Sequence, residues 1–122
     1  MDITEEVERL VGLSGVSEGL VTVGVAGSTA SVTTIEYESG VVEDLRAAID
    51  RIVPRNIEYL HDLRWGDGNG YAHVRAALLG PSVSIPIHNG RVVLGQWQQL
   101  VLCDFDNRPR CREVYVSIMA GT

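Results

Sequence analysis

Two hydrophobic patterns divide the first half of the chain. Valine alternates with threonine, glycine and alanine through residues 20–26, which is the pattern of a half-buried strand. From Ser39 to Val53 the apolar residues recur three or four positions apart instead. This spacing predicts a helix that Ser39 caps and Pro54 ends. The motif Asp2-Ile3-Thr4-Glu5 resembles a capping box and predicts a short helix near the N-terminus.

The second half continues with a helix and then strands. Asn69 is a suitable cap for a third helix, which Gly80-Pro81 would end, and Asn89-Gly90 is typical of a tight hairpin turn. Further strands are predicted at residues 30–36, 83–87, 91–94, 98–105 and 113–119. This order predicts an α+β fold, in which two to three helices pack on a largely antiparallel sheet or sandwich. The length of 122 residues predicts that residues 1–122 form a single domain.

Composition excludes several classes of function. The net charge is −6 and no basic stripe offsets it, so we expect no nucleic acid and no membrane surface as partner. No apolar run approaches the ~20 residues that span a bilayer, and no signal peptide opens the chain, so a cytoplasmic protein is expected. All ten basic residues are arginine. Lysine chemistry is therefore excluded, and any cation that holds a substrate must be arginine or a metal.

The two cysteines, Cys103 and Cys111, lack the spacing of a zinc site. They fall on the two arms of a predicted hairpin whose tip lies near Asn107. A disulfide between these arms is geometrically feasible, but buried free thiols are the expected state in a cytosolic chain.

The segment from His61 to His73 holds most of the candidate chemistry, including two of the three histidines. If Asn69 caps a helix, Asn69 and His73 share one face of it, and the amides at the helix start favour an anion. The same segment predicts a pocket for phosphate, or for a divalent metal such as Mg or Zn held by His61 and His73. One carboxylate, from Asp62, Asp67 or Glu36, would complete such a metal site. The alternative is an ordinary turn into a helix with structural histidines.

Three smaller features are also candidates for substrate binding. Ser28 and Thr29 lie between two predicted strands and could hold an oxyanion, although a plain turn is the better explanation when they are taken alone. Trp97 and Gln98 offer stacking surface beside amide donors, with a core tryptophan as the alternative.

Arginines at positions 108, 110 and 112 alternate along a predicted strand and would share one face of it. That face could bind an anionic ligand through Arg110 and Arg112. The alternatives are a solvated strand edge and a subunit interface.

Several motifs together resemble the YjbQ-like family, and the resemblance extends over the whole chain. The most specific block is Gly90-x-x-x-Leu94-Gly95-Gln96-Trp97-Gln98. The other matching segments are Asp2-Ile3-Thr4, Ser14-Gly15-Val16, Gly27-Ser28-Thr29-Ala30, Thr34-Ile35-Glu36, Asp44-Leu45, His61, Asn69, His73, Leu79-Gly80-Pro81-Ser82, Asp104, Arg110 and Arg112.

The resemblance implies a compact β-rich homotrimer with a polar, histidine-lined pocket near a subunit interface. Family members are often described as secondary thiamine-phosphate synthases because of a weak activity that joins a phosphorylated pyrimidine to a phosphorylated thiazole. Most members carry His-Thr-Thr where this chain reads Gly27-Ser28-Thr29. A three-histidine metal site would thus become a two-histidine site that needs a carboxylate or water, or no metal site at all. Many members also have an extra strand before Asp-Ile-Thr, which is expected to be absent here.

Two functional hypotheses follow. The first is a small-molecule enzyme or former enzyme acting on a phosphorylated metabolite, with His61 and His73 as general acid and base. Its substrate contacts would come from Ser28, Thr29, Glu36, Asn69, Trp97, Gln98, Arg110 and Arg112. The second is a non-enzymatic trimeric binding or accessory protein whose pocket holds a metal or a phosphorylated metabolite.

Overall fold

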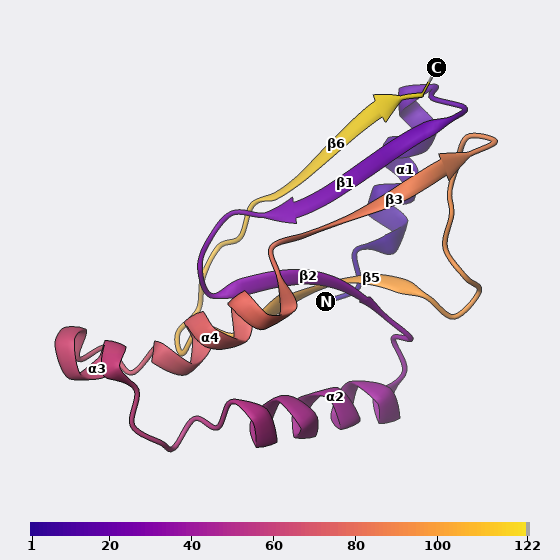
Figure 1. Cartoon of the computed structure of the whole chain (residues 1–122). Coiled ribbons are helices and arrows are strands. Elements are labelled where there is room, and N and C mark those ends of the chain that lie inside the picture. Colours follow the sequence, from indigo (N-terminus) through magenta and orange to yellow (C-terminus); the bar gives the residue numbers. More distant parts are fainter. Residues whose placement is uncertain (122) are drawn as a thin grey trace.

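A computed structural model describes residues 1–121, and it has the predicted α+β architecture (Figure 1). The helices are α1 (Thr4–Ser14), α2 (Ser39–Ile52), α3 (Leu60–Trp65) and α4 (Gly70–Leu79). The strands are β1 (Gly19–Val25), β2 (Ala30–Ile35), β3 (Ser82–His88), β4 (Arg91–Val92), β5 (Gln99–Asp104) and β6 (Val114–Ala120).

The strands form two antiparallel layers. One is a four-stranded sheet with the order β4-β3-β1-β6, and the other is a two-stranded ribbon in which β2 pairs with β5. Valines of β1 and β2 meet Leu100 of β5 between the layers, and α1 adds Val7 and Val11 to the same core. Figure 1 shows α4 and α2 on the opposite side of the ribbon. The β2–β5 ribbon is therefore the middle layer, and α4 packs against β2.

The alternation read in residues 20–26 is confirmed. Val21, Val23 and Val25 are buried, while the residues between them are half-exposed. The hairpin at Asn89-Gly90 is also confirmed, because both residues have the positive φ values, 52° and 76°, that a type I′ turn requires. Glycine and asparagine tolerate this left-handed conformation better than other residues do.

The helices differ from the prediction in three ways. There are four of them rather than two or three, because residues 60–65 form α3 inside the segment read as a polar loop. Ser39 is the first residue of α2, and the carboxylate of Glu38 caps this helix by accepting from the amides of Gly40 and Val41. Asn69 does precede α4, but its side chain makes no capping hydrogen bond.

The hairpin predicted around Asn107 is wrong. β5 ends at Asp104 and pairs with β2, whereas β6 begins at Val114 and pairs with β1, so the two strands belong to different layers. The connection between them, residues 105–113, has no regular secondary structure. Cys103 and Cys111 are both free thiols; the first is half-buried and the second is exposed, so the expected burial is also wrong for Cys111. Within residues 1–121, no helix has the length and apolar character needed to cross a membrane.

Candidate functional site

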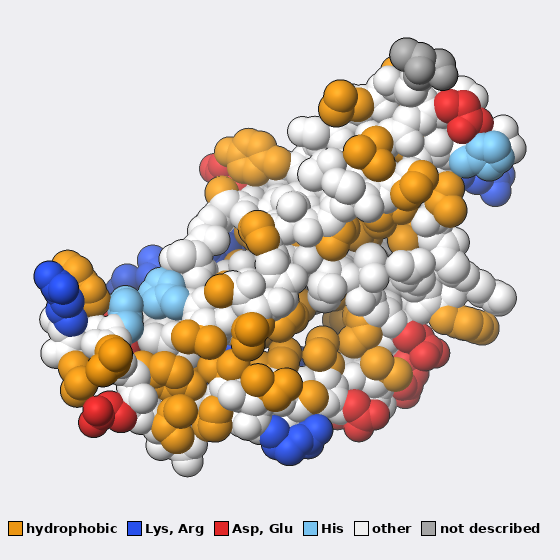
Figure 2. Space-filling view, in the orientation of Figure 1, with side chains coloured by type: hydrophobic (Ala, Val, Ile, Leu, Met, Phe, Trp, Pro, Cys, Tyr) orange, Lys and Arg blue, Asp and Glu red, His pale blue; other side chains and the backbone are white. Residues whose placement is uncertain are grey.

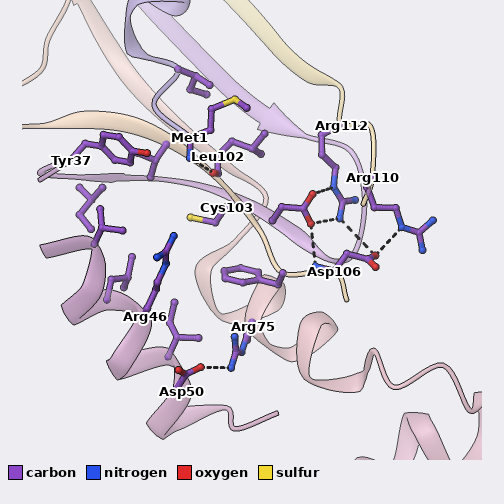
Figure 3. Close-up of a pocket in the computed structure, with 18 of the residues that line it drawn as sticks. Met1, Tyr37, Arg46, Asp50, Arg75, Leu102, Cys103, Asp106, Arg110 and Arg112 are labelled. Carbon is purple, nitrogen blue, oxygen red and sulfur yellow. Dashed lines mark hydrogen bonds and ion pairs between the residues drawn. The ribbon is translucent and has the colours of Figure 1, made fainter. Parts of the chain in front are cut away.

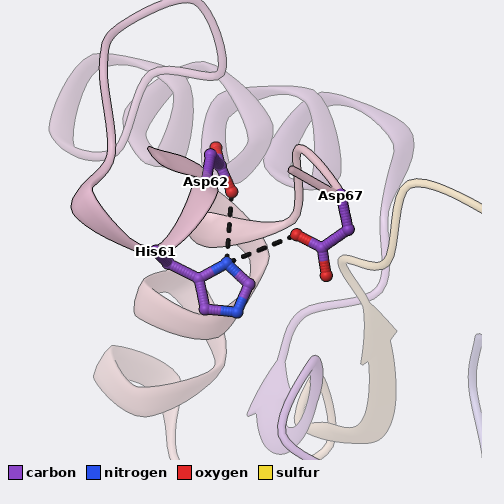
Figure 4. A group of neighbouring side chains, drawn as sticks. All are labelled: His61, Asp62 and Asp67. Atoms are coloured by element: carbon purple, nitrogen blue, oxygen red, sulfur yellow. Dashed lines mark hydrogen bonds and ion pairs between the residues drawn. The ribbon is translucent and has the colours of Figure 1, made fainter. Parts of the chain in front are cut away.

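The turn between α3 and α4 brings one histidine and two aspartates together (Figure 4). Nδ1 of His61 lies 3.2 Å from an oxygen of Asp62 and 3.3 Å from an oxygen of Asp67. The three atoms all lie within 4.8 Å of one another. Tetrahedral coordination with bonds of about 2.0 Å to nitrogen and oxygen separates its ligand atoms by roughly 3.3 Å, so this donor set fits a divalent ion as well as a hydrogen-bonded triad.

Asp62 also fixes the start of α4. Its carboxylate accepts a hydrogen bond from the amide of Gly70 at 2.9 Å. This amide was predicted to help bind an external anion, but the protein's own carboxylate already takes it. The hydrogen bond from His61 outweighs partial burial and, with that from Gly70, holds the pKa of Asp62 below its usual value. Asp62 is therefore ionised near neutral pH, and the position attracts cations rather than phosphate.

His73 faces this cluster from α4. Its ring centre lies 4.6 Å from that of His61, with the ring planes tilted by 55°. Nδ1 of His73 lies 3.1 Å from the backbone oxygen of Ser28, which can only accept, so Nδ1 carries the proton. This contact fixes the tautomer and leaves Nε2 as the basic nitrogen. The histidine pair expected from the sequence is thus assembled in space.

Behind the histidines lies a buried carboxylate that the sequence reading did not single out. The Asp106 side chain is 2% exposed. One oxygen accepts from the hydroxyl of Thr29 and from Nε of Arg110, both at 3.0 Å, and the other accepts from the amide of Arg108 at 3.1 Å. Asp106 therefore joins the β1–β2 turn to the irregular segment that follows β5.

The protonation state of Asp106 follows from these contacts. Burial alone would raise its pKa, but the hydrogen bonds from Thr29, Asn69, Arg108 and Arg110 together lower it to about 2. Asn69 belongs to the same network, because its side-chain oxygen accepts the amide of Asn107 at 3.1 Å. The expected role of Asn69 as a helix cap is thus replaced by a link between α4 and the 105–113 segment.

The arginines do not share a strand face, because residues 105–113 are irregular. Arg112 gives its Nε and one terminal nitrogen to Asp104 and also donates to the hydroxyl of Thr29. Its side chain is only 11% exposed, which makes its role structural. Arg110 gives Nε to Asp106 but remains 39% exposed. Of the two predicted anion ligands, Arg110 is the more exposed, and its ion pair with Asp106 uses Nε rather than a terminal nitrogen.

Gly27 has a conformation that is unfavourable for a residue with a side chain. Its φ is +134°, and an added Cβ would lie 2.8 Å from a terminal nitrogen of Arg112. The space that another side chain would use at position 27 is therefore taken by that guanidinium.

Known proteins match this chain over nearly its whole length. The family model described as "UPF0047 protein YjbQ-like" matches residues 1–121. The chain belongs to the YjbQ-like UPF0047 family. A UPF0047 protein of Archaeoglobus fulgidus is 38% identical over 119 residues, covering 98% of this chain and 90% of that protein. The UPF0047 protein YugU of Bacillus subtilis is 33% identical over 121 residues, covering 98% and 88%.

Solved structures give the same result. A YbjQ-like protein of unknown function from Sulfolobus solfataricus matches with a TM-score of 0.92 at 34% identity, covering 99% of this chain and 86% of that one. An uncharacterised YjbQ/UPF0047 protein from Clostridium acetobutylicum matches with a TM-score of 0.88 at 35% identity, covering 98% and 89%.

The remaining candidates in this YjbQ-like protein lie at the other end of the ribbon. Gln98 contacts Thr34 and the amide of Gly95, and Trp97 is 65% exposed. Glu36 follows Ile35, which pairs with Gln99, whereas the histidine site adjoins the end where Ala30 pairs with Asp104. Six residues of strand separate these ends by roughly 17 Å. Within one protomer, Glu36, Trp97 and Gln98 therefore do not reach the histidine site.

Proposed function

We propose that the cluster of His61, Asp62 and Asp67 binds a divalent metal ion and that the protein acts with it on a small phosphate-bearing substrate. The observation that carries this proposal is the convergence of one imidazole nitrogen and two carboxylate oxygens within 4.8 Å. Asp62 and Asp67 together place two negative charges beside His61, and nearby Asp106 is neutralised by arginine. A divalent ion would balance these charges and supply the positive charge that a phosphate group needs.

The other side chains then have separate roles. His73 is held by Ser28 through Nδ1, so its Nε2 is available to take or give a proton. His61 serves as a metal ligand. The general acid–base role, which was expected for both histidines, therefore falls to His73 alone. Arg110 supplies terminal nitrogens for the phosphate oxygens. Asp106 positions Arg110 and, through Thr29, the turn that carries Ser28.

Metal titration tests the first part. Protein purified without a histidine tag and treated with chelator would be titrated with Zn²⁺, Mn²⁺ and Mg²⁺ by calorimetry. We expect one bound ion per chain. His61→Ala and Asp67→Asn should weaken binding by more than the roughly 10–100-fold that loss of an outer-shell partner causes. His88→Ala is the matched control. His88 also pairs with a carboxylate, that of Glu18 at 2.9 Å, but this pair is exposed and lies outside the proposed metal site.

The second part is tested by ligand binding in the presence of the bound ion. Pyrophosphate and thiamine phosphate should bind the metal-loaded protein, and chelation should abolish this binding. Arg110→Gln should weaken both ligands while leaving metal affinity unchanged. The absence of metal binding by the wild-type protein would refute the first part, and binding of phosphate ligands regardless of metal would refute the second.

A homotrimer is a further part of the proposal. Leu60, Leu63 and Trp65 of α3 are 82%, 65% and 68% exposed, which is an unusual apolar surface for a helix of six residues. We place the subunit contact on this surface. Light scattering would then give a trimeric mass for the wild type and a smaller mass for Leu63→Asp.

The alternative function is a non-enzymatic binding protein. It would have the same metal-binding site but would convert no substrate.

A further inference from the structure

A cavity of about 770 Å³ lies between α2 and the β2–β5 ribbon (Figure 3). Leu45 and Ile49 of α2 form one wall, and Ile35 and Phe105 lie on the ribbon side. The volume is in the range of sites for small molecules, which are mostly apolar with a few polar groups. Figure 2 shows hydrophobic side chains gathered over this part of the molecule, around the hollow beneath the ribbon.

The chain leaves this space unfilled. α2 is amphipathic by sequence, yet none of its residues is buried. Its apolar face instead borders the cavity, where Val42, Leu45 and Ile49 remain only half-buried. Protein interiors are normally packed with few voids larger than a water molecule, so this apolar wall remains free to contact a ligand.

One end of the cavity carries an excess of positive charge. Arg55 donates to the hydroxyl of Tyr71 at 2.7 Å, and its guanidinium lies 4.7 Å from the centre of that ring. Arg75 lies 5.0 Å from the same ring centre and pairs with Asp50 at 2.8 Å. Arg55 is an exposed residue, and within residues 1–121 no carboxylate oxygen lies within 4.0 Å of it. Two arginines at this end thus share one aspartate.

The opposite end is electrically balanced. Arg112 pairs with Asp104 at 2.9 Å, and Arg110 pairs with Asp106 at 3.0 Å. Arg46 points from α2 toward the cavity in Figure 3, but its charge is matched by Glu43 at 2.9 Å. The charge that lacks a partner is therefore that of Arg55.

We propose that this cavity binds an amphipathic anion, with its apolar body between α2 and the ribbon and its carboxylate or phosphate head on Arg55. An uncharged apolar ligand would fill the space but would gain nothing from the Arg55 guanidinium, which is accessible to a charged head group. The apolar body of the anion covers the apolar face of α2, and its negative head group pairs with Arg55. None of His61, Asp62, Asp67 and His73 lines this cavity, and its opposite end shares Arg110 with the phosphate site proposed above. Binding at Arg55 does not depend on a bound metal.

Calorimetry with defined probes tests the site. Decanoate and decyl phosphate carry the same apolar chain with different heads, and decanol is the uncharged control. We expect at least one anion to bind wild-type protein and decanol to bind about tenfold more weakly, the effect of losing one charged hydrogen bond. Arg55→Gln should lower the affinity for the anion by a similar factor. Arg91→Gln is the control, because Arg91 is exposed on β4, away from the cavity.

A second variant removes the space rather than the charge. Leu45→Trp enlarges a wall residue and should abolish binding of both anions, with the circular dichroism spectrum and the oligomeric state unchanged. His61→Ala should leave anion binding intact, which separates this proposal from the metal site. The proposal is overturned if neither anion binds, if decanol binds as tightly, or if Arg55→Gln has no effect. It is also overturned if Leu45→Trp changes the oligomeric state while no anion binds, since a second copy would then fill the cavity.

Discussion

The two faces of the β2–β5 ribbon have different environments. On one face, Val32 and Leu100 are fully buried against the four-stranded sheet and α1. On the other face, Cys103 is half-buried beside a cavity, and the opposing helix α2 has no buried residue. The first face stabilises the fold by close packing. The second leaves a cavity beside α2, and this is where we place ligand binding.

The largest expected difference is between two leucines truncated in the same way. Leu100→Ala should lower the free energy of unfolding by about 3 kcal/mol, because it leaves a void in a packed core. Leu45→Ala on α2 should cost less than about 1 kcal/mol, since this side chain is only half-buried. Urea denaturation of both variants measures the two values. Equal losses would contradict the proposed contrast between the faces.

The Asp106 network should come next in size. Asp106→Asn leaves Arg110 and Thr29 with a neutral partner in a buried position and should destabilise the protein by about 2 kcal/mol. Glu43→Gln is the control; it removes one partner of an exposed pair with Arg46, which should cost about 0.5 kcal/mol at most.

Lowering the pH should remove the same stabilising contribution of Asp106 from the wild-type protein. The pKa of Asp106 is lowered from 3.8 to about 2, so its contribution to stability is complete above 3.8 and is lost as the pH falls toward 2. Denaturation measured across this interval should show a steeper decline for the wild type than for Asp106→Asn. Parallel curves would contradict the assigned pKa.

A smaller effect is expected at the turn that joins the two layers. Gly27→Ala should cost about 1–2 kcal/mol, because a residue with a side chain is strained at φ +134° and its Cβ would displace Arg112. Gly12→Ala in α1 is the opposite case, since nothing lies within 4 Å of the added Cβ. It should stabilise the helix by roughly 0.5–1 kcal/mol. Thermal melting of both variants would test the difference in sign.

The smallest effect concerns the two thiols. Burial raises the pKa of Cys103, whereas Cys111 is exposed. Because the thiolate is the reactive form, Cys111 should react with an aromatic disulfide reagent faster than Cys103. The reaction should therefore have a fast and a slow kinetic phase. The single variants Cys103→Ser and Cys111→Ser show which thiol gives each phase. Decanoate should slow the Cys103 phase alone, and equal protection of both thiols would argue against ligand binding in the cavity.

The regular elements could be predicted from local pattern. Alternating valines identified β1, apolar spacing identified α2, and Asn89-Gly90 identified the β3–β4 turn. The histidine pair was also found, because two imidazoles within one glycine-rich segment are uncommon. Asp106 was missed, although the close run of Asp104 and Asp106 before alternating arginines is the pattern that produced its network.

The sequence by itself determined most of the elements, α3 excepted, and the short segment that carries His61 and His73. These properties depend on residue type and on spacing of a few positions. Only the tertiary structure decided that Asp62 takes the start of α4, that β5 and β6 belong to different layers, and that Arg112 occupies the space beside Gly27. Each of these is a contact between segments distant in sequence or a competition for one polar group. Such outcomes depend on how the whole chain packs, because local pattern does not specify which partners meet.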